Sequence, residues 1–240
     1  MNPLVVNSPE RREAERLRAV RLMLLSRLLS YPNKDTARLL SELSVAADLD
    51  SAGAFSALAA VTSRLHDQGA VDAFGSEYID LFDRGQAKAS LHETEYGLPL
   101  GKGNKLADLA GFYQAFGFAF RSEEAEMLDH VAVELEFYAL LLVKTAALRE
   151  RGDDDGVDIV LDARRKFFDA HLGSLLATLA EQDSLKEHPT LGPVVRAARL
   201  FADEEAFALG IAPVVAPMSM GPAEDEQMEC ATSSRLPVVN

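Results

Sequence analysis

The stretch that decides the fold lies at residues 127–151, which read MLDHVAVELEFYALLLVKTAALRER. Its large apolar side chains recur at three- and four-residue intervals, as Val131, Leu135, Tyr138 and Leu142 do, and this is the spacing of a buried helix face. Gly152 and the acidic run 153–155 predict a turn directly afterwards. We therefore expect one long helix over residues 127–151.

The same spacing predicts helices on both sides of this stretch, several of them with a residue suited to start or stop them. Asp35 is an expected N-cap, Ser122 is the expected cap of a helix start at 121–124, and Pro189 suits a first helical turn. No convincing strand pair and no short-period repeat stands out. The fold class is therefore all-α, a single-domain bundle of about eight helices. The predicted helices cover residues 10–30, 36–47, 51–66, 71–82, 105–118, 127–151, 156–182 and 189–208.

The domain organisation follows from composition. Residues 1–9 hold two prolines and are predicted to be a flexible leader, and residues 10–209 form the helical domain. After Gly210 the chain has four prolines and few large apolar residues, so 210–240 is expected to be a mobile tail that folds only against a partner. The glycine-rich stretch 83–104 is predicted to be a long loop, and such loops are often functional.

The net charge limits the kind of partner that the protein can bind, and the cysteine content indicates its compartment. The 240 residues carry a formal net charge of −14, which disfavours nucleic acid and anionic membrane surfaces and favours a cationic partner; the alternative is that the charge only confers solubility. The single cysteine, Cys230, permits no intrachain disulfide and suits the cytoplasm. Arg11 and Arg12 are followed by further charges instead of an apolar stretch, so they do not form an export signal.

The first candidate site is Asp129-His130. On a continuous helix, His130 would lie one turn from both Glu126 and Glu134, so the three side chains would share a face. Three interpretations stay open: a carboxylate–metal site, an acidic binding site, or a solvated helix face. A helical di-iron site would need two Glu-x-x-His pairs, which this sequence lacks, so no metal and no cofactor is assigned.

The other candidates carry weaker chemistry. The glycines and lysines at 101–105 lack the ending of a phosphate-binding loop, so a hinge is the better interpretation. The aromatic cluster at 112–120 has the spacing of a core, although Tyr113 and Tyr96 would also suit a groove. No Ser-His-Asp signature or nucleophile elbow is present, and Cys230 has no activating base in sequence, so the protein is not expected to be an enzyme.

Four segments in a fixed order resemble the TorD/DmsD/NarJ family of chaperones that mature molybdenum-containing redox enzymes. The strongest is the stretch 129–137, which is similar to the family's Asp-His-x-x-x-Glu-Leu-Glu-Phe, although Leu128 stands where the family often has proline. The loop 92–97 is similar to the corresponding loop in the branch of the family that serves type II enzymes of the dimethyl sulfoxide reductase family. The four segments are YIDLF at 78–82, LADLAGFYQAFGF at 106–118, DHVAVELEF at 129–137 and FDAHL at 168–172.

The resemblance implies a cytoplasmic, all-α chaperone. The long loops of the chain permit either a monomer or a swapped dimer. It would bind the apo catalytic subunit of a molybdopterin oxidoreductase, assist insertion of the molybdenum cofactor, and recognise the client's twin-arginine signal peptide. The alternatives are a carboxylate–metal enzyme built on Glu126, His130 and Glu134, and a generic helical adaptor. The residues that the resemblance assigns to client or signal-peptide binding are Asp129, His130, Glu134 and Tyr96. Tyr113 joins this predicted binding set because a tyrosine suits the lining of a groove.

Overall fold

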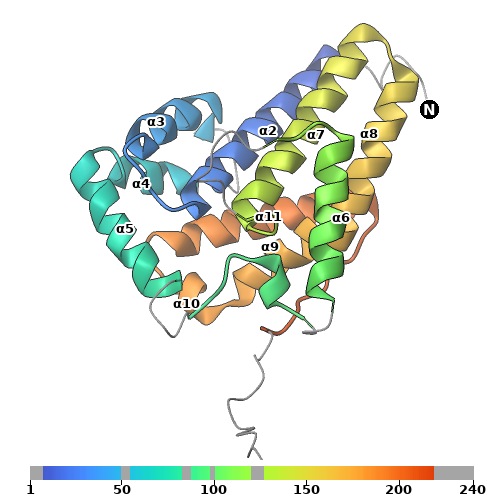
Figure 1. The fold of residues 1–240 in the computed structure, drawn as a ribbon. Coiled ribbons are helices and arrows are strands. Elements are labelled where there is room, and N and C mark those ends of the chain that lie inside the picture. The colour runs from blue at the N-terminus through green and yellow to red at the C-terminus, as the bar shows by residue number, and fades with distance from the viewer. Residues whose placement is uncertain (1–7, 50–54, 83–87, 98–100, 120–126, 219–240) are drawn as a thin grey trace, which may run out of the picture.

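The computed structural model describes residues 8–49, 55–82, 88–97, 101–119 and 127–218. Within these ranges the regular structure is helical, with two isolated β-bridges, which confirms the all-α prediction (Figure 1). None of the helices described there is long and apolar enough to cross a membrane. The helices are α2 Pro9–Leu29, α3 Thr36–Ala46, α4 Ala57–Arg64, α5 Gln68–Phe82, α6 Lys102–Ala115, α7 Val131–Arg151, α8 Asp154–Phe167, α9 Gly173–Glu181, α10 Asp183–Lys186 and α11 Leu191–Leu209, with short turns η3 Glu93–Glu95 and η4 Phe168–Leu172.

The core is built around α7. Helix α2 lies along α7 over much of its length, and α8 packs against α7 from the other side (Figure 1). Because neighbours cover it on several faces, α7 buries large side chains around most of its circumference, including Leu135, Phe137 and Leu142. Helix α7 ends at Gly152, which adopts the left-handed conformation that favours glycine, as the turn prediction required.

The predicted start of the central helix is wrong by four residues. Helix α7 begins at Val131, because His130 has an extended backbone and its ring accepts a hydrogen bond from the Ala132 amide. His130 is therefore the N-cap of α7 and does not lie on its surface. The predicted helix start around Ser122 lies outside the described residues.

The predicted helix at 156–182 is three consecutive segments. Helix α8 passes through the π-helical turn η4 into α9 without leaving the helical region. A Cβ atom on Gly173 would lie 2.8 Å from the Phe168 carbonyl oxygen, so this close passage of the backbone requires glycine. The wider turn places His171 and Leu172 in the interior.

A buried ion network joins α2, α7, α8 and α11. Arg164 lies 2.8 Å from a carboxylate oxygen of Glu205 and 3.5 Å from one of Glu15. Arg18 and the Tyr138 hydroxyl also contact the Glu205 carboxylate. Burial alone would raise the pKa of Glu205, but the charges of Arg164 and Arg18 outweigh it and lower the pKa. Glu205 therefore stays ionised and links four helices.

The segment after α11 runs along the domain. Gly210 closes α11, and the backbone of 211–218 then passes α9 and reaches the loop that ends at Gly97. The amide of Gly97 donates to the Pro217 carbonyl (2.9 Å), and Tyr96 forms a β-bridge with Met218. The segment predicted as a tail from residue 210 thus begins with a stretch in contact with the domain; residues 219–240 lie outside the described part of the chain.

Candidate functional site

The site forms where the loop 88–97 meets the start of α7. The Glu93 amide donates to the Asp129 carbonyl, and the Val131 amide donates to the Leu91 carbonyl, each at 2.8 Å. Between these two bonds, His92 and His130 form an antiparallel β-bridge. Segments almost 40 residues apart in sequence are thereby held backbone to backbone, directly before the first turn of the central helix.

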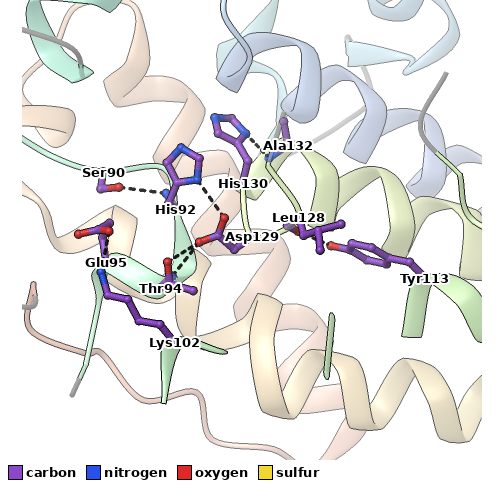
Figure 2. Close-up of polar contacts among 10 residues, drawn as sticks. All are labelled: Ser90, His92, Thr94, Glu95, Lys102, Tyr113, Leu128, Asp129, His130 and Ala132. Carbon is purple, nitrogen blue, oxygen red and sulfur yellow. Dashed lines mark hydrogen bonds and ion pairs between the residues drawn. The ribbon is translucent and has the colours of Figure 1, made fainter. Parts of the chain in front are cut away.

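Asp129 fastens the loop with its side chain (Figure 2). One carboxylate oxygen accepts from His92 Nδ1 (3.1 Å), and the other accepts from the Thr94 amide (3.2 Å) and the Thr94 hydroxyl (2.6 Å). Burial alone would raise the pKa of Asp129, but these bonds and the charge of His92 outweigh it and lower the pKa to about 2. Asp129 is 2% exposed, so its charge is directed at the loop and not at solvent.

His130 contributes its ring to the same site. Its Nδ1 accepts from the Ala132 amide at 3.2 Å, which makes the ring a helix cap. Burial, helped by the neighbouring His92, lowers the pKa of His130 to about 3, so the ring is neutral at pH 7. The His92 and His130 rings meet edge to face, with centroids 5.0 Å apart.

Two buried tyrosines hold the backbone on either side. The Tyr96 hydroxyl accepts from the Ser90 amide (3.1 Å) and donates to the Ser90 carbonyl (2.6 Å), so it closes the loop 90–96 on itself. The Tyr113 hydroxyl donates to the Leu128 carbonyl (2.8 Å), next to Asp129. Burial raises the pKa of both phenols, so both remain hydrogen-bond donors.

Glu134 lies one turn into α7 and is fully buried. Neither of its carboxyl oxygens has a hydrogen-bond partner in the described structure. Burial, followed by the charges of Glu93 and Asp129, raises its pKa well above the usual value, so the neutral acid is favoured. The nearby Glu93 is also buried, but it is paired with His171 Nδ1 and Lys105 Nζ, each at 3.0 Å.

An open pocket of about 280 Å³ lies beside the two histidines. Its walls are largely aromatic, and the ring of Tyr31 packs against Tyr78, with centroids 5.6 Å apart. Tyr31 is half exposed, so the pocket is reached from the surface. The pocket is lined by Tyr31, Tyr78, Ile79, Phe82, Ser90, Leu91, His92 and His130.

The structure brings together the five residues predicted to bind a client, but it buries all of them. Glu134 is completely buried, and Asp129, His130, Tyr96 and Tyr113 are 2–3% exposed. Of the five, only His130 lines the pocket. The other four bond to or pack beneath the backbone that shapes this pocket, and their part in client binding stays a prediction.

His130 and Glu134 do not form the shared helix face on which the metal alternative depended. His130 precedes the helix and its ring caps the helix, so it does not share a helix face with Glu134, and Glu126 lies outside the described residues. In the described ranges, no group of three or more His, Cys, Asp or Glu side chains could hold a metal ion. The alternative of a carboxylate–metal enzyme on these residues therefore loses its geometric basis.

Sequence reasoning missed three members of the site. His92 and Thr94 were read only as part of a similar loop, and His171 only as part of a helix motif. Their partners lie 35 to 78 residues away in sequence, at Asp129 and Glu93, so helical spacing could not reveal them. The available signal was the charged, polar character of 92–95 inside a glycine-rich loop.

The chain is similar in sequence to two proteins named as assembly chaperones, and it matches one family model. The chain is 34% identical over 163 residues to the selenate reductase assembly chaperone protein of Thauera selenatis, covering 62% of this chain and 83% of that protein. It is 33% identical over 151 residues to the chlorate reductase assembly chaperone protein of Ideonella dechloratans, covering 57% of this chain and 77% of that protein. Residues 46–181, which include the loop, the start of α7 and His171, match the family model described as nitrate reductase delta subunit. The chain therefore belongs to the nitrate reductase delta subunit family, and the resemblance to the NarJ and TorD type of maturation chaperone is confirmed.

Proposed function

We propose that this protein is a cytoplasmic assembly chaperone that binds the catalytic subunit of a molybdenum reductase before the molybdenum cofactor is inserted. The observation that carries the proposal is the similarity to two proteins named for assembling reductases, over most of the length of each. Family membership over 46–181 supports it independently. The role is to hold a client and not to catalyse a reaction.

The pocket beside His92 and His130 is the proposed client contact. Its aromatic walls suit a large apolar side chain, and the histidine rings and Ser90 at its edge suit the polar backbone next to that side chain. Asp129 acts by position, since it fixes His92 and Thr94 and so fixes one wall of the pocket.

The twin-arginine signal peptide is a finer proposal for the same surface. Its apolar segment would enter the aromatic pocket, and the net charge of −14 would attract its arginines. Both oxygens of Asp129 already accept hydrogen bonds, so the guanidinium groups would pair with exposed carboxylates instead.

Calorimetric titration tests the proposal with the apo catalytic subunit of a molybdenum reductase from the same organism, and separately with the N-terminal peptide of that subunit. Replacing Tyr31 by serine removes a half-exposed wall of the pocket, and we expect binding of the apo subunit to weaken about tenfold or more. The matched control is Phe207→Ser, which removes an exposed aromatic ring that does not line the pocket. Equal affinities for Tyr31→Ser and the control would contradict the pocket assignment.

His130→Asn separates capping from client contact. Asparagine is a good N-cap, so the fold should be retained while the imidazole leaves the pocket.

A chaperone should also bind the apo subunit more tightly than the cofactor-loaded one. A generic adaptor would show no such preference, and failure to bind either form would refute the proposed function.

A further inference from the structure

The segment 211–218, here called the C-terminal strap, lies on a surface made by Ser174 and Thr178 of α9 and the Tyr96–Gly97 edge, and it is held there almost entirely by its backbone. This surface is called the groove below. The Val214 amide donates to the Ser174 hydroxyl (3.1 Å), and the Ala216 amide donates to the Thr178 hydroxyl (3.0 Å). Ser174 and Thr178 are four residues apart on α9 and therefore share one face of that helix. Two residues of extended chain span nearly the same length as one helical turn, so alternate amides meet successive hydroxyls.

The strap continues onto the loop 88–97, which lines part of the proposed client pocket. Its Pro217 carbonyl accepts from the Gly97 amide (2.9 Å), and Met218 bridges to Tyr96. Tyr96 closes the loop onto Ser90, which lines the aromatic pocket. The loop 88–97 thus contributes one end to the groove and the other end to the pocket.

The side chains of the strap contribute little to this attachment. Val214 is 69% exposed and Val215 is 47% exposed, while Ile211 and Ala216 pack only in part against the core. Prolines 213 and 217 stand at positions where no amide is needed, since the donating amides are at 214 and 216. A groove that recognises alternate backbone amides would accept other extended sequences of this kind.

The geometry points to a second client contact: the groove formed by Ser174, Thr178 and the Tyr96–Gly97 edge binds an extended segment of the client, and the C-terminal strap occupies this groove until the client displaces it. The fitting segment is uncharged and extended, with backbone amides at alternate positions and small apolar residues or prolines between them. The identity of the occupant rests on the proposed client binding; the existence of an exchangeable groove does not. A strap that fills the groove nine-tenths of the time would weaken the apparent affinity about tenfold.

The test uses the full chain with Val214→Pro and Ala216→Pro together, which remove the two donating amides. The matched control carries Ala212→Pro and Val215→Pro, which add the same two rings at neighbouring exposed positions for which the structure gives no backbone hydrogen bond. The first probe is a blocked synthetic peptide of sequence Ile-Ala-Pro-Val-Val-Ala-Pro-Met, identical to residues 211–218. We expect it to bind the first variant at least about tenfold more tightly than the control, and Thr178→Val added to that variant should abolish the gain.

The second probe is the apo catalytic subunit. We expect the variant with Val214→Pro and Ala216→Pro, called the strap-released variant, to bind this subunit several-fold more tightly than the control does. In the absence of client, its Gly97 amide should also exchange hydrogen faster. Absence of peptide binding to the strap-released variant would overturn the groove. Peptide binding with equal client affinity for both variants would overturn the client as occupant. If neither variant bound the client while the peptide still bound, the proposed function would fail, and the assignment of the client to the groove would fail with it.

Discussion

Replacing Asp129 by asparagine should destabilise the protein by an amount that depends on pH. Lowering the pKa from 3.8 to about 2 means that the folded state favours the ionised carboxylate by about 2 kcal/mol. Because the folded pKa is the lower one, this stabilisation is present above pH 3.8 and is lost as the pH falls towards 2. At pH 3 about 1 kcal/mol of it should remain.

Asparagine keeps the size of the side chain but cannot accept from both His92 and Thr94 as a carboxylate does. A buried donor left without its acceptor costs about 1–3 kcal/mol, so with the charge effect of about 2 kcal/mol the total loss at pH 7 should be about 3–5 kcal/mol. The assay is urea unfolding followed by circular dichroism at pH 7, 5 and 3. The difference between wild type and variant should shrink by about 1 kcal/mol between pH 5 and pH 3.

The matched control for this experiment is Asp158→Asn, which changes an exposed carboxylate on α8. Its unfolding free energy should stay within about 0.5 kcal/mol of wild type at each pH. The reasoning about Asp129 would be refuted if its variant behaved like the control, or if its deficit were the same at pH 5 and pH 3. Either result would mean that the carboxylate does not hold the loop by its charge.

Three further changes test other parts of the structure. Glu134→Gln should stabilise the protein at pH 7.5 relative to wild type, because wild type loses stability as the pH rises above the usual Glu pKa and the glutamine variant does not. A gain that persists at pH 4 would contradict this. Glu205→Ala should lower the unfolding free energy by about 3–5 kcal/mol, because it leaves the buried Arg164 with only the more distant Glu15 carboxylate. Replacing the exposed Glu204 by alanine should have little effect, and similar melting temperatures for the two variants would contradict the role of the network. Tyr113→Phe should cost about 1 kcal/mol in urea unfolding, the value of its bond to the Leu128 carbonyl, and an unchanged midpoint would show that this bond contributes nothing.

The helices were largely predictable from the sequence because their apolar spacing is local information. The predicted end of the central helix at residue 151 is confirmed, and so is the turn at Gly152. The start was misplaced because 127–130 continue the helical pattern, whereas in the structure Asp129 and Val131 bond to the loop 88–97 and the His130 ring caps the helix. Such long-range competition is invisible to a spacing argument.

The candidate site was predictable in its location but not in its geometry. Asp129 and His130 were found through a family motif, and the structure places them at the junction of the long loop and the central helix. Their burial could not be inferred, since charged side chains are usually exposed and the sequence does not state that Asp129 has His92 and Thr94 as partners. Asp129 is therefore interpreted as a buried carboxylate that holds the loop 88–97 beside an aromatic pocket, and no longer as part of a charged surface.

The pairing of α2 with α7 has a consequence for how this protein is made. Roughly 100 residues of chain separate the two helices, so at a ribosomal rate of about 5–20 residues per second α2 waits on the order of 5–20 s for the helix that covers it. During that interval α2, which buries Leu22, Leu25 and Leu29 in the finished fold, can pack against α3 but not yet against α7. The proposed chaperone thus leaves the ribosome before α2 can pack against α7, and its yield in cells should depend on how quickly the segment 131–151 follows.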